Sequence, residues 1–245
     1  MKSVLIFGAT SAIAQEVAKI LALRGARLLL VARDEGKLSA LAENLQVLAG
    51  QRPDFKGIDF SSTDQIAAVI QQTRNRFGGL DLILVAHGSL PDQRICESNP
   101  EEALEAMRVN LLSFVAILSV AANEMEQQRR GCIAAISSVA GDRGRQSNYV
   151  YGAAKAGLTV FLQGLRNRLA KSGVTVVTIK PGFVDTPMTA HLPKNFLFAQ
   201  PATIASGIVK AIEHKRDVVY LPFFWRFVML VIRLIPERVF KKLKL

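Results

Sequence analysis

The sequence has few of the residues that form disulfides or bind metals. Among 245 residues there are two cysteines, Cys96 and Cys132, and three histidines, His87, His191 and His214. Two cysteines do not make a disulfide framework, and the histidines show no metal-ligand spacing. We therefore expect no metal site, and we expect the histidines to lie in loops or on the surface.

Other absences bear on location and domain organisation. Met1-Lys-Ser leads directly into an apolar strand, so we expect no signal peptide and a reducing, cytoplasmic setting. No repeat, low-complexity tract or Pro/Gly/Ser-rich linker marks a boundary. Because α/β chains of about 250 residues are commonly a single unit, we expect one main domain, residues 1–222, followed by an extension, residues 223–245.

Short apolar runs alternate with helical stretches along the chain. The expected strands span residues 3–7, 27–32, 55–59, 81–86, 132–137, 174–180 and 217–221. This alternation favours the α/β class, with a single doubly wound parallel sheet (a Rossmann fold) and helices on both faces.

The segment from Ser138 to Lys155 holds side chains that together can perform acid–base chemistry on a carbonyl group. Tyr151 and Lys155 begin an Ala-rich helical run and, four residues apart, share one of its faces. A free tyrosine titrates near pH ~10, and a nearby ammonium lowers that value. We therefore expect Lys155 to make Tyr151 an effective proton donor and acceptor. We expect Ser138, at the end of an apolar strand, to form a hydrogen bond with the substrate oxygen.

The N-terminal residues predict a dinucleotide site. A strand runs into Gly8, and the small-residue turn 8–14 opens a helix that continues through Leu23. Such a turn binds pyrophosphate, because free backbone N–H groups and the positive end of the helix dipole face the anion. The second strand ends on Arg33, which suits the extra phosphate of NADP. We expect NADP(H) as the preferred cofactor; Asp34, which follows, leaves NAD(H) as the alternative.

With these features in order, the chain resembles the short-chain dehydrogenase/reductase family from about residue 2 to residue 222. Six segments carry the resemblance: Gly8-Ala-Thr-Ser-Ala-Ile-Ala14, Asp59-Phe60, Leu84-Val-Ala-His-Gly88, Asn110, Ser138 with Tyr151 and Lys155, and Pro181-Gly-Phe-Val184-Asp-Thr186. The first segment departs from the family pattern, because Ala12 and Ala14 stand where the family has glycines. Weaker cofactor binding is the expected effect.

The resemblance implies an enzyme that reduces a carbonyl group or oxidises the alcohol, and that forms a dimer or tetramer. It assigns Asn110, Ser138, Tyr151 and Lys155 as the catalytic set, with Asn110 holding a relay water and Lys155 also binding the nicotinamide ribose. The cofactor contacts are expected at Gly8, Thr10, Ser11, Ile13, Arg33, Asp59, Phe60, Ala86, Gly88, Tyr151, Lys155, Pro181, Gly182, Val184 and Thr186.

The sequence gives fewer indications of the substrate than of the cofactor. Arg143 and Arg145 are expected near the substrate mouth, where paired arginines suit a phosphate; solvated loop charges are the alternative. Residues 142–151 also resemble the corresponding stretch of decaprenylphosphoryl keto-pentose reductases, which act on a polyprenyl-phosphate sugar. A flap, residues 186–198, is expected to give the pocket an apolar wall through Met188, Leu192, Phe196 and Phe198; packing against helices is the alternative for these residues. We expect a small-molecule carbonyl substrate that is hydrophobic or lipid-linked.

The last twenty residues combine positive charge with apolar side chains. They hold six basic residues against Glu237 alone, in a chain of net charge +11. Arginines interrupt the apolar runs too often for a bilayer span, which needs about 20 apolar residues. A tail this apolar argues against nucleic acid as the partner. We expect residues 223–245 to lie in a membrane interface; packing on the domain or on a second subunit is the alternative.

Two other functions fit parts of the sequence. A regulator that binds NADPH without turnover would explain the alanine-substituted turn, but its catalytic set should be broken, and here it is complete. An epimerase or dehydratase acting on a nucleotide sugar needs a long C-terminal substrate region that this sequence does not show.

Overall fold

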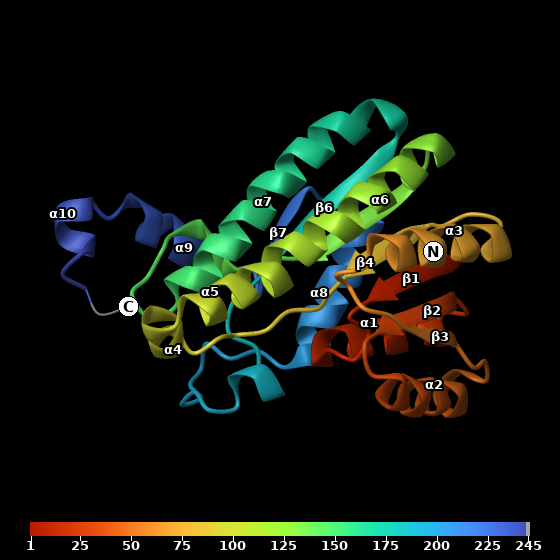
Figure 1. The fold of residues 1–245 in the computed structure, drawn as a ribbon, viewed down its shortest axis with the longest axis horizontal. Helices are drawn as coiled ribbons and strands as arrows, with labels where there is room; N and C mark the ends of the chain where they lie inside the picture. Colours follow the sequence, from red (N-terminus) through yellow and green to blue (C-terminus); the bar gives the residue numbers. More distant parts are fainter. Residues whose placement is uncertain (244–245) are drawn as a thin grey trace.

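The computed structural model describes residues 1–243, and its centre is one sheet of seven parallel strands between two layers of helices (Figure 1). The strand order is β3-β2-β1-β4-β5-β6-β7. The strands are β1 (Ser3–Phe7), β2 (Arg27–Ala32), β3 (Asp54–Gly57), β4 (Leu82–Val85), β5 (Gly131–Ile136), β6 (Val174–Pro181) and β7 (Val218–Leu221). The predicted α/β, doubly wound fold is confirmed. The winding reverses between β1 and β4, and α/β sheets bind ligands at such a point.

The strands lie within two residues of their expected positions. The largest difference is at β3, which ends at Gly57 rather than at residue 59. The carboxylate of Asp59 accepts hydrogen bonds from the backbone N–H of Ser61 at 2.9 Å and from its hydroxyl at 2.7 Å. These two bonds turn the chain away from the sheet toward the next helix.

Helices cover both faces of the sheet (Figure 1). On one face lie α1 (Ala12–Leu23), α2 (Glu35–Ala49) and α8 (Pro201–Glu213), and on the other lie α3 (Thr63–Phe77), α6 (Ser113–Gln128) and α7 (Tyr149–Leu169). In β1, Val4 and Ile6 face the first layer, whereas Leu5 and Phe7 face the second. Because parallel strands are buried on both faces, they read as continuous apolar runs, which is how the sequence shows them.

A long helical run crosses the second layer. After the short helix α4 (Gln93–Ser98), it consists of α5 (Pro100–Met107), a π-helical segment η1 (Arg108–Leu112) and α6. By length and composition the run from Pro100 to Gln128 passes the test for a membrane span. However, Phe114, Ile117 and Leu118 on α6 are buried in the core on the sheet. This burial is that of a core helix packed on a sheet.

The C-terminal extension lies at one end of the molecule and packs one side on the domain (Figure 1). It contains α9 (Trp225–Leu234) and α10 (Glu237–Phe240). Trp225 and Met229 are only 3% and 1% exposed and pack with Val139 of the 3-10 turn η2 (Val139–Asp142). Lys244, one of the six basic residues of the tail, lies outside the described residues.

Arg143 fastens this extension. Its Nη1 donates hydrogen bonds to the carbonyl oxygens of Ile232 and Ile235, both at 2.6 Å, and its Nη2 donates to the Glu237 carboxylate at 2.9 Å. The guanidinium carbon lies 3.7 Å from the centroid of the Phe240 ring. Carbonyls at a helix C-terminus lack intrahelical donors, so Arg143 supplies the donors for the end of α9. The Arg143 guanidinium therefore stabilises the fold. It does not bind a phosphate at the substrate mouth, which was one of the two interpretations of the sequence.

Candidate active site

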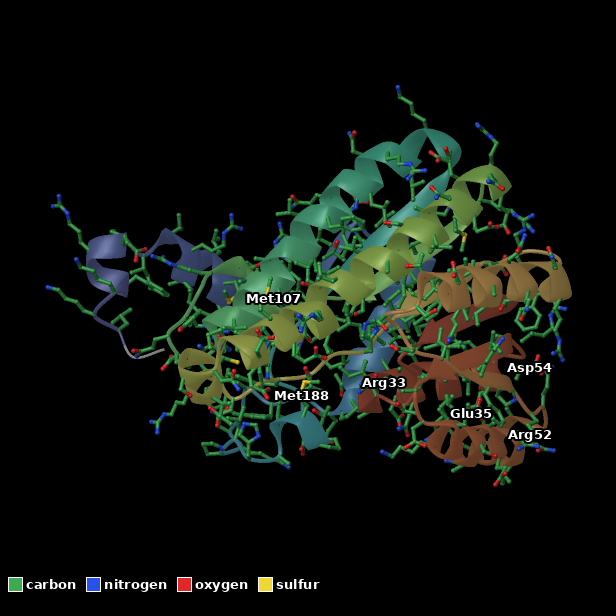
Figure 2. The ribbon with its side chains drawn as sticks, in the orientation of Figure 1. Arg33, Glu35, Arg52, Asp54, Met107 and Met188 are labelled. Carbon is green, nitrogen blue, oxygen red and sulfur yellow. The ribbon has the colours of Figure 1, made fainter. Side chains whose placement is uncertain are left out.

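A cavity of about 930 Å³ collects residues from the carboxyl ends of the strands. Every residue predicted to contact the cofactor lines this cavity, as do Ser138, Tyr151 and Lys155. Asn110 is fully buried and is not part of the lining. Arg33, at the end of β2, and Met188, on the flap after β6, line the same cavity and are labelled in Figure 2. The structure thus brings together residues that are more than 150 positions apart.

The turn after β1 has no room for a side chain at its first position. Gly8 has φ of +74°, and a Cβ atom there would lie 2.4 Å from the backbone nitrogen of His87. Ser11 then caps α1, its hydroxyl accepting from the N–H of Ala14 at 3.3 Å. Of the two alanines that replace family glycines, Ala12 lines the cavity, whereas Ala14 is buried in the core. The first N–H groups of α1 remain as anion donors beside the cavity.

The segment after β5 lies directly on the helix that carries Tyr151 and Lys155. A Cβ atom on Gly141 would lie 2.6 Å from the carbonyl carbon of Lys155, so η2 and α7 meet backbone to backbone. Ser138, immediately before η2, accepts a hydrogen bond from the N–H of Ala140 at 3.1 Å. This contact sets the position of Ser138 relative to the tyrosine and the lysine.

Burial controls the protonation of the tyrosine and the lysine. It lowers the pKa of Lys155 from 10.5 to about 7. It raises the pKa of Tyr151 to about 12, while a hydrogen bond with Ser138 acts in the opposite direction. Lys155 Nζ donates to the carbonyl oxygen of Ile136 at 3.0 Å and lies 5.7 Å from the centroid of the Tyr151 ring. The expected lowering of the tyrosine pKa by Lys155 does not appear, because desolvation of the buried phenol is the largest effect and raises that pKa.

Asn110 sits in the π-helical segment, a feature that often marks functional sites. Its Nδ2 donates to the carbonyl oxygen of Ala106 at 3.0 Å, and its Oδ1 accepts from the N–H of Ser89 at 3.1 Å. Gly88 has φ of +155°, and a Cβ atom there would lie 2.9 Å from Asn110 Oδ1 and 3.7 Å from Lys155 Nζ. The absence of a side chain at Gly88 leaves room for the Asn110 amide behind it and for the Lys155 ammonium.

His87 is the main site residue that the sequence did not predict. It lines the cavity, and its ring stacks on Phe114 and contacts Phe60, with centroid distances of 4.1 and 4.7 Å. Ser113 Oγ donates to the Val109 carbonyl at 2.8 Å, so His87 Nε2 donates to Ser113 Oγ at 2.7 Å. Burial lowers the His87 pKa to about 3. His87 lies in the loop after β4, as expected, but its ring points inward and packs between Phe60 and Phe114.

Arg33 and Asp34 differ in how much freedom the fold leaves them. Asp34 is the N-cap of α2, its carboxylate accepting from the N–H of Lys37 at 3.0 Å. Arg33 is exposed at the cavity, and its charge contributes to the lowered pKa of the Asp59 carboxyl, whose largest cause is the hydrogen bond from Ser61 N–H. Of these two neighbours, Arg33 is the one whose side chain is available to a ligand.

The expected flap contributes only part of an apolar wall. Met188 and Leu192 line the cavity. Phe196 is 91% exposed, and Phe198 stacks on Phe183 at a centroid distance of 5.2 Å instead of joining the lining. Among residues 1–243 no cluster of three or more histidine, cysteine or acidic side chains has the arrangement of a metal site.

Comparison with known proteins agrees with this geometry. The family model described as short chain dehydrogenase matches residues 2–196. An uncharacterized oxidoreductase of Mycobacterium tuberculosis (strain ATCC 25618 / H37Rv) is 32% identical over 243 residues, which are 98% of this chain and 96% of that protein. An uncharacterized oxidoreductase of Streptomyces coelicolor is 31% identical over 245 residues, 99% of this chain and 96% of that protein.

A solved structure supports the fold independently. The crystal structure of levodione reductase matches with a TM-score of 0.81 and 24% identity, over 90% of this chain and 95% of that chain. At that identity the likeness shows the fold alone. The family match over most of the chain carries the assignment: the chain belongs to the short-chain dehydrogenase/reductase family and is an oxidoreductase.

Proposed function

We propose that the protein is an NADP(H)-dependent reductase that converts a carbonyl group on a hydrophobic or lipid-linked substrate to the alcohol. The observation that carries the proposal is the cavity in which Ser138, Tyr151 and Lys155 face the same space as the predicted cofactor contacts. Gly8 and Gly88 both line the cavity. At either position a Cβ atom would collide with neighbouring protein atoms, so only glycine fits. When bound, NADPH supplies the hydride.

Four side chains carry out or support the proton transfer. Tyr151, with its raised pKa, is a neutral phenol at neutral pH and donates its proton to the carbonyl oxygen. Ser138 Oγ–H polarises that oxygen by a hydrogen bond. Lys155 restores the phenol proton, and Asn110, behind Gly88, orients the donors that feed Lys155. Hydride on carbon and a proton on oxygen complete the reduction to an alcohol.

Tyr151→Phe tests the proton donor. The change deletes one hydroxyl, so NADPH binding should remain close to normal, while turnover should fall by at least ~10²-fold, as loss of a general acid implies. The measurement is NADPH oxidation against a carbonyl panel that includes polyprenyl-phosphate keto-sugars. Tyr149→Phe is the matched control, because Tyr149 begins the same helix and is 45% exposed. Near-normal turnover of Tyr151→Phe would disprove the assignment, and NADPH binding without turnover by the wild type would favour the regulatory alternative.

The lowered pKa of Lys155 predicts a pH-dependent stability. From about pH 7, where the folded protein releases this proton, to about pH 10.5, where the unfolded protein does, the unfolded state binds more protons. The free energy of unfolding therefore rises with pH in this window by up to about 1.4 kcal/mol per pH unit, and below it the contribution is flat.

Lys155→Met abolishes this contribution. The unfolding free energy of the wild type relative to the variant should rise as pH increases from 7 toward 9, measured by urea denaturation. Lys171→Met, at an exposed lysine, is the control and should track the wild type. A difference between wild type and Lys155→Met that does not change with pH would contradict the buried-amine assignment.

The preference for NADP(H) over NAD(H) rests on Arg33. Its neighbour Asp34 is engaged as a helix cap, whereas Arg33 is exposed and lines the cavity, which supports Arg33 as the partner of the additional phosphate. A charge-assisted hydrogen bond contributes about 1.5–3 kcal/mol, and only NADPH carries the additional phosphate. Arg33→Ala should weaken NADPH binding roughly tenfold to a hundredfold and leave NADH binding almost unchanged, as measured by calorimetry. Equal losses for the two cofactors would make Arg33 a structural residue.

The outer side of the C-terminal extension supports a peripheral membrane contact at the cytoplasmic face. Phe223, Phe227, Val231 and Leu234 are all exposed. Exposed basic side chains accompany them: Arg226, Arg233, Arg238, Lys241 and Lys242. An apolar face flanked by basic groups suits an interface with anionic lipid. Because the inner side of the extension packs on Val139, which lines the cavity, a lipid-bound molecule would keep the cavity near its lipid-linked substrate.

The membrane contact is tested with the full chain, because ending it at Pro222 would also remove the buried Trp225. Phe227→Gln, Val231→Gln and Leu234→Gln combined should abolish co-sedimentation with anionic liposomes at low salt. Val47→Gln, at a residue 85% exposed on α2, should bind as the wild type does. If the wild type stays in the supernatant and the triple variant lowers the oligomeric state, the face is a subunit interface instead.

A further inference from the structure

Arg145 is a guanidinium placed against the cavity without a partner. It lines the cavity, and its Nε is buried without a hydrogen-bond partner. Within residues 1–243 the side chain makes no hydrogen bond and no ion pair, unlike Arg143 two residues earlier. Burial lowers the Arg145 pKa. A buried N–H donor without a partner costs free energy, and a ligand in the cavity would supply the acceptor that Arg145 Nε lacks.

Asn148, at the start of α7, has the same property. It lines the cavity, and its Oδ1 is buried without a hydrogen-bond partner. Asparagine at the position before a helix usually caps it with its side chain, yet Asn148 makes no such bond. Its N–H donates to the Arg145 carbonyl at 3.1 Å, so one tight turn carries both side chains. Tyr151 follows three residues later, one helical turn away.

The charges of the lining also single out Arg145. Four basic residues line the cavity, Arg33, Arg108, Arg145 and Lys155, against the acidic residues Asp59 and Glu105. Arg108 pairs with Glu105 at 3.4 Å, and Arg33 acts on Asp59. Lys155 belongs to the catalytic set. Arg145 is thus the lining cation that has no acidic neighbour and belongs neither to the catalytic set nor to the expected cofactor contacts.

We propose that Arg145 and Asn148 form a subsite for an anionic, hydroxyl-bearing part of the carbonyl substrate, with Arg145 binding a phosphate or carboxylate and Asn148 accepting a hydrogen bond from a hydroxyl. The planar guanidinium suits two parallel hydrogen bonds to either anion. The inference rests on the proposed function, because it takes the cavity to hold a carbonyl substrate beside Tyr151. It narrows the substrate class to a hydroxylated carbonyl compound that carries an anionic group, such as a keto-sugar phosphate.

Binding of octyl phosphate, 1-octanol and inorganic phosphate to the full chain tests the subsite without any turnover. Calorimetric titrations are run with saturating NADPH, which occupies the cofactor phosphate sites, and again without it. The wild type should bind octyl phosphate more tightly than 1-octanol. Arg145→Gln should weaken octyl phosphate binding roughly tenfold to a hundredfold and leave 1-octanol binding unchanged, and Arg145→Lys should fall in between.

Arg216→Gln is the matched control, because it removes an exposed arginine before β7, at the opposite end of the strands from the cavity. It should bind all three compounds as the wild type does.

Competition by inorganic phosphate would show that the anion alone suffices, as for a free phosphate ester. Binding of octyl phosphate without such competition would indicate a lipid-linked phosphate. Equal octyl phosphate affinity in the wild type and Arg145→Gln, with unchanged melting temperatures, would overturn the subsite. Absence of carbonyl reduction would count against the proposed function alone.

Discussion

The backbone contact between Gly141 and α7 is the constraint on which the site depends. It allows η2 to lie on the helix at Lys155, and it thereby joins the end of β5, with Ser138, to the first turn of α7, with Tyr151. The next residue reinforces it, since the buried carboxylate of Asp142 pairs with Lys180 of β6 and accepts a hydrogen bond from the Tyr220 hydroxyl at 2.7 Å. Strands β5, β6 and β7 are therefore tied together at the edge where the cavity opens.

Burial at this junction explains the electrostatics of the site. The same apolar enclosure that packs Phe114 against Lys155 and His87 disfavours every charged form, so the lysine and histidine pKa values fall and the tyrosine pKa rises. The Tyr151 phenol and the His87 imidazole are neutral at pH 7, and burial widens the pH range over which each stays neutral. A phenol that keeps its proton is suited to donate it to a developing alkoxide. Burial of Tyr151 therefore favours the protonated form, which is the form that a reduction needs.

Much of this arrangement could be predicted from the sequence, and the rest could not for physical reasons. Local rules are enough to identify Gly8 from a tight turn and Arg33 from a strand end. Helical spacing identifies the pair Tyr151 and Lys155. The function of Arg143 depends on Ile232 and Ile235, about ninety residues away, and only tertiary contacts reveal it. The buried state of His87 likewise follows from Phe60 and Phe114, which no local pattern connects to it. Local chemistry identifies candidate groups, whereas packing decides which of them stay free.

Gly182 and Trp225 show how far the cavity depends on the end of the chain. A Cβ atom on Gly182 would lie 1.9 Å from Trp225 Nε1, so the indole occupies the space that a side chain at residue 182 would need. Gly182 lines the cavity, and the indole supports it from outside. The sizes of the two side chains are consequently linked, since a larger residue at 182 requires a smaller one at 225. A change on α9 is therefore also a change in the wall of the cavity, and substrate shape and C-terminal sequence cannot be altered independently.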